Sequence, residues 1–338
     1  MNRSLFATSG AFLLAVTLLT LASARSRPPA SPDATGLRIL EAASSLFDSL
    51  DEKQRRQAFH DYGDKERFNW HFIPKDRKGL PLKELDGNRR GRITALLRAV
   101  LSEKGARRAE DVMALEDILR EIEGPSRSFA RDPLLYYLSF FGKPSREGRW
   151  GVRLEGHHLS LNFSLHGERV LSATPAFYGA NPAIVREGPR KGLRVLGGLE
   201  DLARELVTSL DGDQQKVCLG EEVPLEVPGT GAGRYVGPFP LGLAAEKLPE
   251  GGRMKLLNLI REYTSNFPED LVKGIVPQEL KGIHFAWRGG LKPFEPHSYL
   301  VHGPDFVINY TNTQNGAAHI HSCLRVLRGE FGLDEAGD

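Results

Sequence analysis

The sequence predicts an α+β fold in which a helical N-terminal region packs on a mainly antiparallel β-sheet. Apolar residues recur at helical spacing through much of residues 37–125, whereas residues 133–335 are dominated by short β-branched and aromatic segments bounded by Gly or Pro. The chain has 338 residues, of which 40% are hydrophobic and 26% charged, so it can bury a large core. We expect residues 37–335 to form a single domain.

The first 24 residues have the pattern of a secretory signal peptide. Arg3 precedes an uncharged run from Ala11 to Ala22, and a small-x-small cleavage pattern ends at Ala24. The alternative is an uncleaved anchor, but a spanning helix needs roughly 20 apolar residues and this run is shorter. We expect cleavage after Ala24, a secreted or periplasmic protein and no transmembrane span in the mature chain. Residues 25–36, rich in Pro and Ser, are expected to be a flexible lead-in.

Apolar spacing and capping residues define the helices of the N-terminal region. Residues 37–50 are amphipathic, and Asp51 is placed to cap the following helix at its N-terminus. Residues 82–105 and 109–124 predict two further helices, each ended by a Gly.

The strand-rich region contains two blocks of predicted strands separated by helices. The segment at 220–252 is dense in Gly and Pro, and we expect an irregular stretch that is partly a lid over a site. No internal repeat is visible at a fixed period. We expect the two strand blocks to form one sheet. The first block is a meander of strands at 134–142, 149–156, 157–167 and 169–179; helices follow at 199–210 and 254–267; the second block has strands at 282–290, 297–303, 305–312 and 319–327.

The stretch "GAAHIHSC" (316–323) places two of the chain's ten histidines two positions apart. In a strand, His319 and His321 share one face with Cys323, and the apolar residues that alternate with them share the other. Same-face residues are ~6.8 Å apart and metal–nitrogen bonds are ~2.0–2.1 Å, so two leaning imidazoles can share one ion. Cys323 lies ~13–14 Å from His319, too far for the same ion. In a helix, the two histidines would diverge by ~200°.

A second histidine pair lies where two apolar patterns fall out of phase. Apolar residues occupy even positions up to Leu154 and odd positions from Leu159 onward. This change requires a turn or a bulge at Gly156, His157 and His158. His158 then lies on the polar side of its strand, and His157 lies with the apolar residues or in the bulge itself.

Three further residues are candidates for the same site. His302 opens a tight turn before the strand at 305–312, which is expected to form a hairpin with the strand that carries His319. Gln314 is less readily explained by turn chemistry than the nearby asparagines, so it is a candidate for orienting a substrate or a histidine. Glu155, beside the histidine pair, is a candidate general base or metal ligand; an exposed strand residue is the alternative.

Several longer stretches together resemble the family catalogued as domain of unknown function 3500, which is found in many exported bacterial proteins. The resemblance covers most of the chain from about residue 40 and implies relatedness without an assigned activity. Where such members usually read "EYDNTQ", this chain has "NYTNTQ", with Asn309 and Thr311 in place of acids. The stretches that carry it include "RFNWHFIP" (67–74), "FFGKPSREGRWGVRLEGHHLSLNF" (140–163), "TPAFYGANPA" (174–183) and "VHGPDFVINYTNTQNGAAHIHSCLRV" (301–326).

Other chemistries lack their sequence signatures. The net charge is +2 without a basic stripe, which argues against nucleic acid as a partner. The sequence contains no G-x-S-x-G elbow, P-loop or H-E-x-x-H motif. A cupin-type pair is disfavoured because no Glu follows His321 at the matching spacing. The two cysteines allow one disulfide at most, and two free, buried thiols are the favoured state.

Three functions remain open. The first is an exported metal-dependent enzyme in which His157 or His158, with His302, His319 and His321, binds zinc, copper or iron. Glu155 would be its proton-transfer group, and Glu155, His158 and Gln314 are the candidate catalytic residues.

The second function is a non-enzymatic binding protein for a glycan or another small cell-envelope ligand. Aromatic side chains and the Asn- and Gln-rich hairpin would supply stacking and amide contacts. The tryptophans Trp70, Trp150 and Trp287 could stack on a sugar, although core packing is their default role. The third function is a metal-free hydrolase that uses His and Glu as acid and base.

Overall fold

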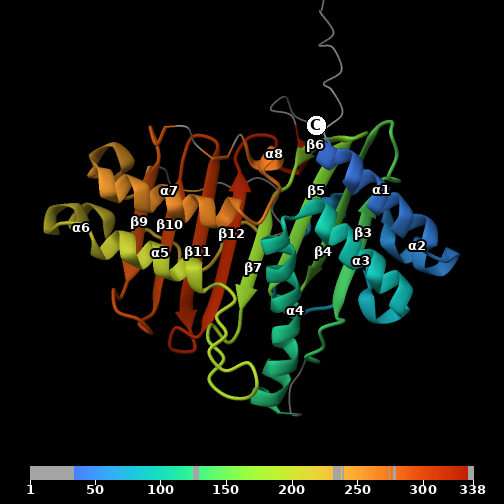
Figure 1. Cartoon of the computed structure of the whole chain (residues 1–338), viewed down its shortest axis with the longest axis horizontal. Helices are drawn as coiled ribbons and strands as arrows, with labels where there is room; N and C mark the ends of the chain where they lie inside the picture. Colours follow the sequence, from blue (N-terminus) through green and yellow to red (C-terminus); the bar gives the residue numbers. More distant parts are fainter. Residues whose placement is uncertain are drawn as a thin grey trace, which may run out of the picture. The chain divides into compact units, whose positions relative to one another are not determined.

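The computed structural model describes residues 34–124, 129–230, 237, 240–273, 275–276 and 279–333. Within these residues, helices pack on a twelve-stranded, mostly antiparallel sheet, which confirms the predicted α+β class (Figure 1). The predicted signal peptide and most of the lead-in lie outside the described residues. Among the helices that are described, none is long and apolar enough to cross a membrane.

The elements follow the predicted alternation of helices and strands. The helices are α1 (Ala34–Ser49), α2 (Glu52–Ala58), α3 (Gly87–Val100), α4 (Glu103–Glu123), α5 (Gly197–Thr208), α6 (Gly212–Cys218), α7 (Glu250–Thr264) and α8 (Glu269–Val272). The strands are β1 (Phe59–His60), β2 (Leu80–Pro81), β3 (Tyr136–Phe141), β4 (Arg149–Gly156), β5 (Leu159–His166), β6 (Arg169–Ser172), β7 (Ala176–Ala180), β8 (Leu243–Ala244), β9 (His284–Gly289), β10 (His297–His302), β11 (Phe306–Gln314) and β12 (His319–Val326).

The two strand blocks form one sheet, as predicted. The strand order is β1-β3-β4-β5-β7-β12-β11-β10-β9-β8, with β2 beside β3 and β6 beside β5. The blocks join where β7 and β12 pair antiparallel, with Gly179 opposite His321 and Tyr178 opposite Ser322. This pairing brings the middle of the sequence next to its C-terminal end.

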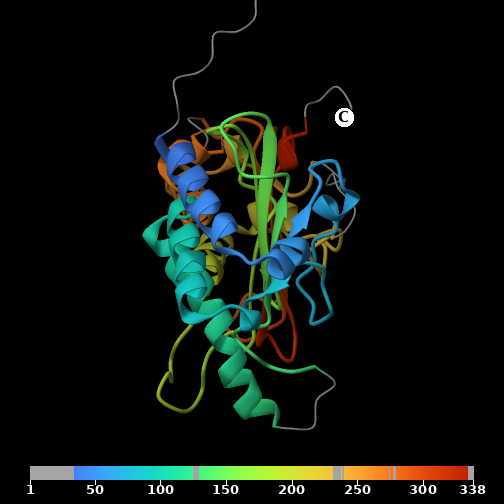
Figure 2. The same cartoon turned by 90° about the vertical axis from the view of Figure 1, so that its right-hand side faces the viewer.

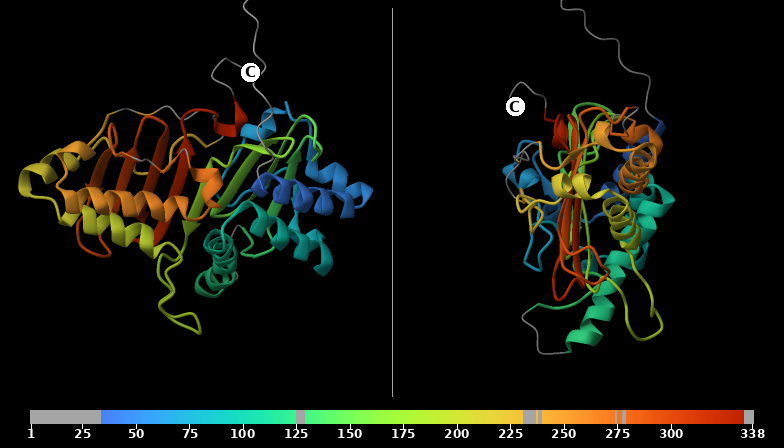
Figure 3. Two further views of the ribbon diagram at one scale, coloured as in Figure 1. Left: turned by 45° about the horizontal axis from the view of Figure 1, so that its top comes forward. Right: turned by 90° about the vertical axis from the view of Figure 1, so that its left-hand side faces the viewer.

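The helices cover one face of the sheet, and irregular segments cover much of the other (Figures 2 and 3). On the helical face, β12 contributes Ile320 and Leu324 to the main core, which also contains buried side chains of α1, α3, α4, α5 and α7. On the opposite face, Cys323 packs with Trp70 and Phe72 of the segment at 61–79. The alternation predicted for β12 is therefore confirmed.

Two predicted boundaries in the N-terminal region are wrong. The single helix expected over 82–105 is a short 3-10 turn, then α3, which ends at Val100; α4 begins directly afterwards with Ser102 as its N-cap. Gly105 does not end a helix, because it lies in the first turn of α4 where a Cβ atom would overlap the backbone of Asn266. The lead-in is also shorter than expected, since α1 already includes residues 34–36.

The fold contains an internal duplication. Helices α1 and α2 correspond to α5 and α6, and the same capping box opens the second helix of each pair: Asp51 with Gln54, and Asp211 with Gln214. Strands β3, β4, β5 and β7 correspond to β9, β10, β11 and β12. The last strands of the two sets, β7 and β12, are neighbours at the centre of the sheet, and the other strands of each set follow outward in reverse order.

Smaller contacts repeat as well. In one half β2 pairs with β3 and precedes α3, and in the other half β8 pairs with β9 and precedes α7. In α3, Arg90 donates to the carbonyl of Leu85, and in α7, Arg253 donates to the carbonyl of Leu248. The spacing between equivalent residues changes from element to element, because the connecting segments differ in length. The duplication therefore leaves no fixed period in the sequence.

Candidate metal centre

The candidate centre lies where the two halves of the sheet meet. The β4–β5 hairpin ends in a two-residue turn, His157-His158, because Gly156 pairs with Leu159. Of the two alternatives left open by the sequence, the turn is therefore correct. His158 has a positive φ of 63°, a conformation that is uncommon for a residue with a side chain.

Two backbone hydrogen bonds hold His158 in this conformation. Its N–H donates to the carbonyl of Phe72 at 2.9 Å, and its carbonyl accepts the N–H of Gly179 at 2.7 Å. A Cβ atom at Gly179 would lie 2.9 Å from Cδ2 of His158, so the glycine leaves room for the imidazole. The first half of the sheet thus presents His158 to the beginning of β12.

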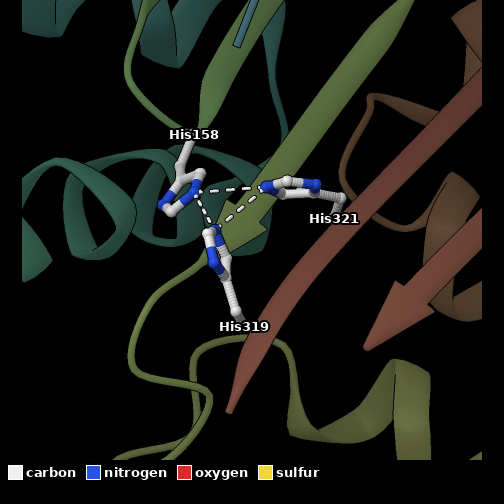
Figure 4. A group of neighbouring side chains, drawn as sticks. All are labelled: His158, His319 and His321. Carbon is white, nitrogen blue, oxygen red and sulfur yellow. Dashed lines mark hydrogen bonds between the residues drawn. The ribbon is translucent and has the colours of Figure 1, made fainter. Parts of the chain in front are cut away.

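The three imidazoles of His158, His319 and His321 converge on one point (Figure 4). Nε2 of His158 lies 2.7 Å from Nε2 of His319 and 3.4 Å from Nε2 of His321, and the last two nitrogens are 3.1 Å apart. His158 and His321 are buried, and His319 is half-buried. This group of three histidines could hold a metal ion.

A carboxylate orients one member of the group. Glu226, in the Gly- and Pro-rich segment, lies 2.7 Å from Nδ1 of His321 through one oxygen and 2.9 Å through the other. A carboxylate at Nδ1 fixes the tautomer with the proton on Nδ1, which leaves the Nε2 lone pair directed at the other histidines. Gln314 donates to the same carboxylate at 3.2 Å. The predicted residue Gln314 therefore supports the group through Glu226.

His157 lies beside the group without joining it. Its ring stacks on that of His158 with centroids 3.7 Å apart, and its Nδ1 lies 2.5 Å from a carboxylate oxygen of Glu116 on α4. Arg131 is 3.2 Å from the same nitrogen and forms an ion pair with Glu123. Because Nδ1 of His157 is engaged by Glu116, this ring is held against His158 in a fixed position.

The surroundings favour the neutral form of two of the central histidines, His158 and His319. Burial lowers the pKa of His158 well below its usual value, and the neighbouring imidazoles lower it further. Burial and the imidazole of His321 lower the pKa of His319 to about 3. A neutral imidazole carries a lone pair on one ring nitrogen and is the form that binds metals.

The three histidines line a cavity of about 450 Å³. Its other walls come from the segment at 71–74 and from His157, Glu226, Val227, Thr230 and Gln314. Of the segment at 220–252, only Glu226, Val227 and Thr230 line the cavity, and residues 231–236 and 238–239 lie outside the described residues. This segment also contains β8 and the beginning of α7, so it is not irregular throughout.

Two predicted site residues lie elsewhere. His302 stacks on His284 at 5.0 Å and accepts the N–H of Leu241; it pairs with Val307, which pairs with Arg325 at the end of β12 remote from His319. His302 is therefore not brought to the group of three.

Glu155 is buried and does not line the cavity. Its carboxylate accepts the N–H of His71 at 3.0 Å and faces Arg153 and Arg77 at 3.4 and 3.7 Å. Burial raises the pKa of Glu155. The structure therefore places this carboxylate beneath the cavity wall, where it holds the backbone of His71.

Sequence reasoning missed the two carboxylates that engage the histidines. Glu116 left a readable signal, because it falls between Val112 and Leu119 on the apolar side of the helix predicted at 109–124. Glu226 left none, because the Gly- and Pro-rich segment around it has no periodicity. The favoured state of the two cysteines is confirmed, because Cys218 and Cys323 are both free and buried.

Comparison with known proteins extends the resemblance noted in the sequence. A search of the curated proteins and a search of the solved structures found no match. A family model described as "Protein of unknown function (DUF3500)" matches residues 33–333, which includes all three central histidines and both supporting carboxylates. The chain therefore belongs to the DUF3500 family.

Proposed function

We propose that this protein is a metal-dependent enzyme whose centre is formed by His158, His319 and His321. The observation that carries the proposal is the convergence of three Nε2 atoms within 3.4 Å of one another. Metal–imidazole bonds of ~2.0–2.1 Å at tetrahedral angles would separate the nitrogens by ~3.3 Å. Shifts of a few tenths of an ångström would bring the three rings to that spacing.

Zinc is the metal that we propose for this centre. Zinc accepts three neutral imidazoles with one open position, whereas non-haem iron sites commonly use two histidines and a carboxylate, and soft sulfur ligands favour Cu(I). The three ligands here are all nitrogens. Copper(II), which also accepts imidazoles, is the second choice, and elemental analysis of the purified protein distinguishes the two.

Catalysis is supported by the cavity in front of the histidines. Three protein ligands leave the fourth tetrahedral position for water, and zinc lowers the pKa of bound water to about 7. A structural zinc site would instead have four protein ligands. Among the described residues, only three His, Cys, Asp or Glu side chains come together here as potential ligands.

The alternative of a glycan-binding protein loses the stacking contacts considered for its tryptophans. The side chains of Trp70, Trp150 and Trp287 are each 0% exposed. An indole ring that is fully buried cannot stack on a sugar. Their packing is that of core residues.

We further propose that the protein is exported and cleaved after Ala24. The support is the sequence pattern of the first 24 residues alone. Expression of the full chain in a bacterium with a general export pathway should yield extracytoplasmic protein whose intact mass corresponds to a chain beginning at Arg25. Protein recovered only from the cytoplasm with its first 24 residues retained would contradict this expectation.

The proposed metal centre predicts that Glu226→Gln weakens zinc binding. Loss of a carboxylate that orients a ligating histidine typically costs 10–100-fold in metal affinity, and we expect a Kd increase of roughly that size, about 10–100-fold. Competition with a zinc-binding indicator dye measures it.

Glu222→Gln is the matched control for Glu226→Gln. Glu222 lies in the same segment and is exposed like Glu226, but it does not line the cavity, so this variant should bind zinc like the wild type. A wild-type protein that binds neither zinc nor copper would contradict the proposed function. An unchanged affinity in Glu226→Gln would show that Glu226 does not orient a ligand.

A further inference from the structure

The cavity in front of the three histidines has an apolar wall built from both halves of the fold. Phe72, Ile73 and Pro74 form one side, and Val227 contributes to the other. Phe72 is fixed, because its ring stacks on Phe177 with centroids 4.1 Å apart. Ile73 is 49% exposed although it lines the cavity. A ligand that covers Ile73 would remove an apolar side chain from water, which is favourable.

The charges around the cavity argue against an anionic ligand. Among the described residues that line it, none is Lys or Arg, and Glu226 contributes a carboxylate. Sites that act on phosphoryl groups use Arg, Lys or Mg²⁺ to neutralise several oxygens at once. Arg77, beneath the wall, is committed to the carbonyls of His71, Ile73 and Gly156. Arg131, beside His157, is paired with Glu123.

We infer that the substrate of this centre is a small, uncharged carboxylic ester with an apolar acyl or aryl group. The inference rests on the proposed function. A cavity of about 450 Å³ falls within the range of small-molecule sites. The apolar group would contact Ile73, Pro74 and Val227, and the ester carbonyl would face the three histidines.

The reaction is hydrolysis by one water molecule. Zinc held by the three histidines would supply hydroxide from water. The hydroxide oxygen would form a bond to the carbonyl carbon, and the bond from that carbon to the alcohol oxygen would break. The proton released when water becomes hydroxide is returned to the departing alkoxide. The products are a carboxylic acid and an alcohol, and no oxidant or reductant is consumed.

Two chromogenic esters with the same leaving group test the substrate class. Zinc-loaded protein should hydrolyse para-nitrophenyl butyrate with saturation kinetics and should leave para-nitrophenyl phosphate unchanged. Ile73→Ser should raise KM for the butyrate by roughly 10-fold, because it removes apolar contacts that the butyryl group would make. The matched control is Ile122→Ser, because Ile122 is 63% exposed on α4 and does not line this cavity.

The outcomes separate the substrate class from the metal centre. Preference for the phosphate ester, no hydrolysis of either ester by protein with stoichiometric zinc, or equal KM values for the two isoleucine variants would overturn the substrate class alone. Absence of bound metal would overturn the proposed function itself. Saturable butyrate hydrolysis that depends on zinc and on Ile73 would support both.

Discussion

Replacing His319 and His321 together by Ala should abolish stoichiometric zinc binding while the protein stays folded. Two of the three ligand nitrogens disappear, and changes outside the ligand set alone already cost 10–100-fold in affinity. Because both side chains leave the sheet on the face opposite Ile320, the core beneath the helices keeps its packing. We expect zinc affinity to fall by far more than about 100-fold, measured by elemental analysis after dialysis.

A matched control is needed because His321 is buried and contacts Phe72 at 4.6 Å. His319→Ala alone removes a half-buried ring and should lose most of the zinc with a smaller effect on stability. His166→Ala removes an exposed histidine at the end of β5 and should leave zinc binding unchanged. A folded double variant that retains one zinc per chain would contradict the assignment of the ligands.

Local patterns predicted the strands that carry the site and the hairpin of β11 with β12, but not the pairing of β7 with β12. The alternation around Ile320 placed His319 and His321 on one face, and the phase change after Leu154 located the turn at His158. Alternation and phase depend only on the residues of the strand itself, so they can be predicted from the sequence. The pairing of β7 with β12 joins residues that are far apart in the chain, and it depends on the whole sheet.

The same limit explains why the prediction for His302 failed. The tight turn after His302 pairs it with Val307 near the beginning of β11, whereas His319 pairs with Gln314 at the opposite end. His302 and His319 therefore lie at opposite ends of β11, although both flank this strand in the sequence. The third histidine of the group is His158, from the other half of the chain. It reaches His319 and His321 because the two halves of the sheet join where β7 pairs with β12.

The duplication also shows why the described residues form one such group of histidines and not two. Gly179 donates to the carbonyl of His158, and at the equivalent place Leu327 donates to the carbonyl of Asp305. The turn that presents His158 in one half thus presents Asp305 in the other. Asp305 forms an ion pair with Arg328 instead. Only one of the two related turns meets a strand with histidines at its beginning.

A buried ion network supports the cavity wall from below. Arg153 on β4 donates to a carboxylate oxygen and to the carbonyl of Glu66, both at 2.8 Å, and it faces Glu155 at 3.4 Å. The arginine is 1% exposed, and both carboxylates are buried. Glu155 in turn holds the N–H of His71, next to Phe72, whose carbonyl accepts the N–H of His158. The network therefore links β4 to the backbone that positions a ligand.

Arg153→Leu should lower the free energy of unfolding by about 3–5 kcal/mol, because it leaves two buried carboxylates without their shared cation. Urea unfolding of the metal-free protein measures this loss. Arg146→Leu is the control: its side chain is 71% exposed and pairs with Glu168, so a change of about 0–1 kcal/mol is expected. Zinc affinity should fall in Arg153→Leu and not in the control, since only the former loosens the backbone next to His158. If Arg153→Leu were as stable as the control, Glu66 and Glu155 would not depend on this arginine, and the proposed link from β4 to the metal centre would be wrong.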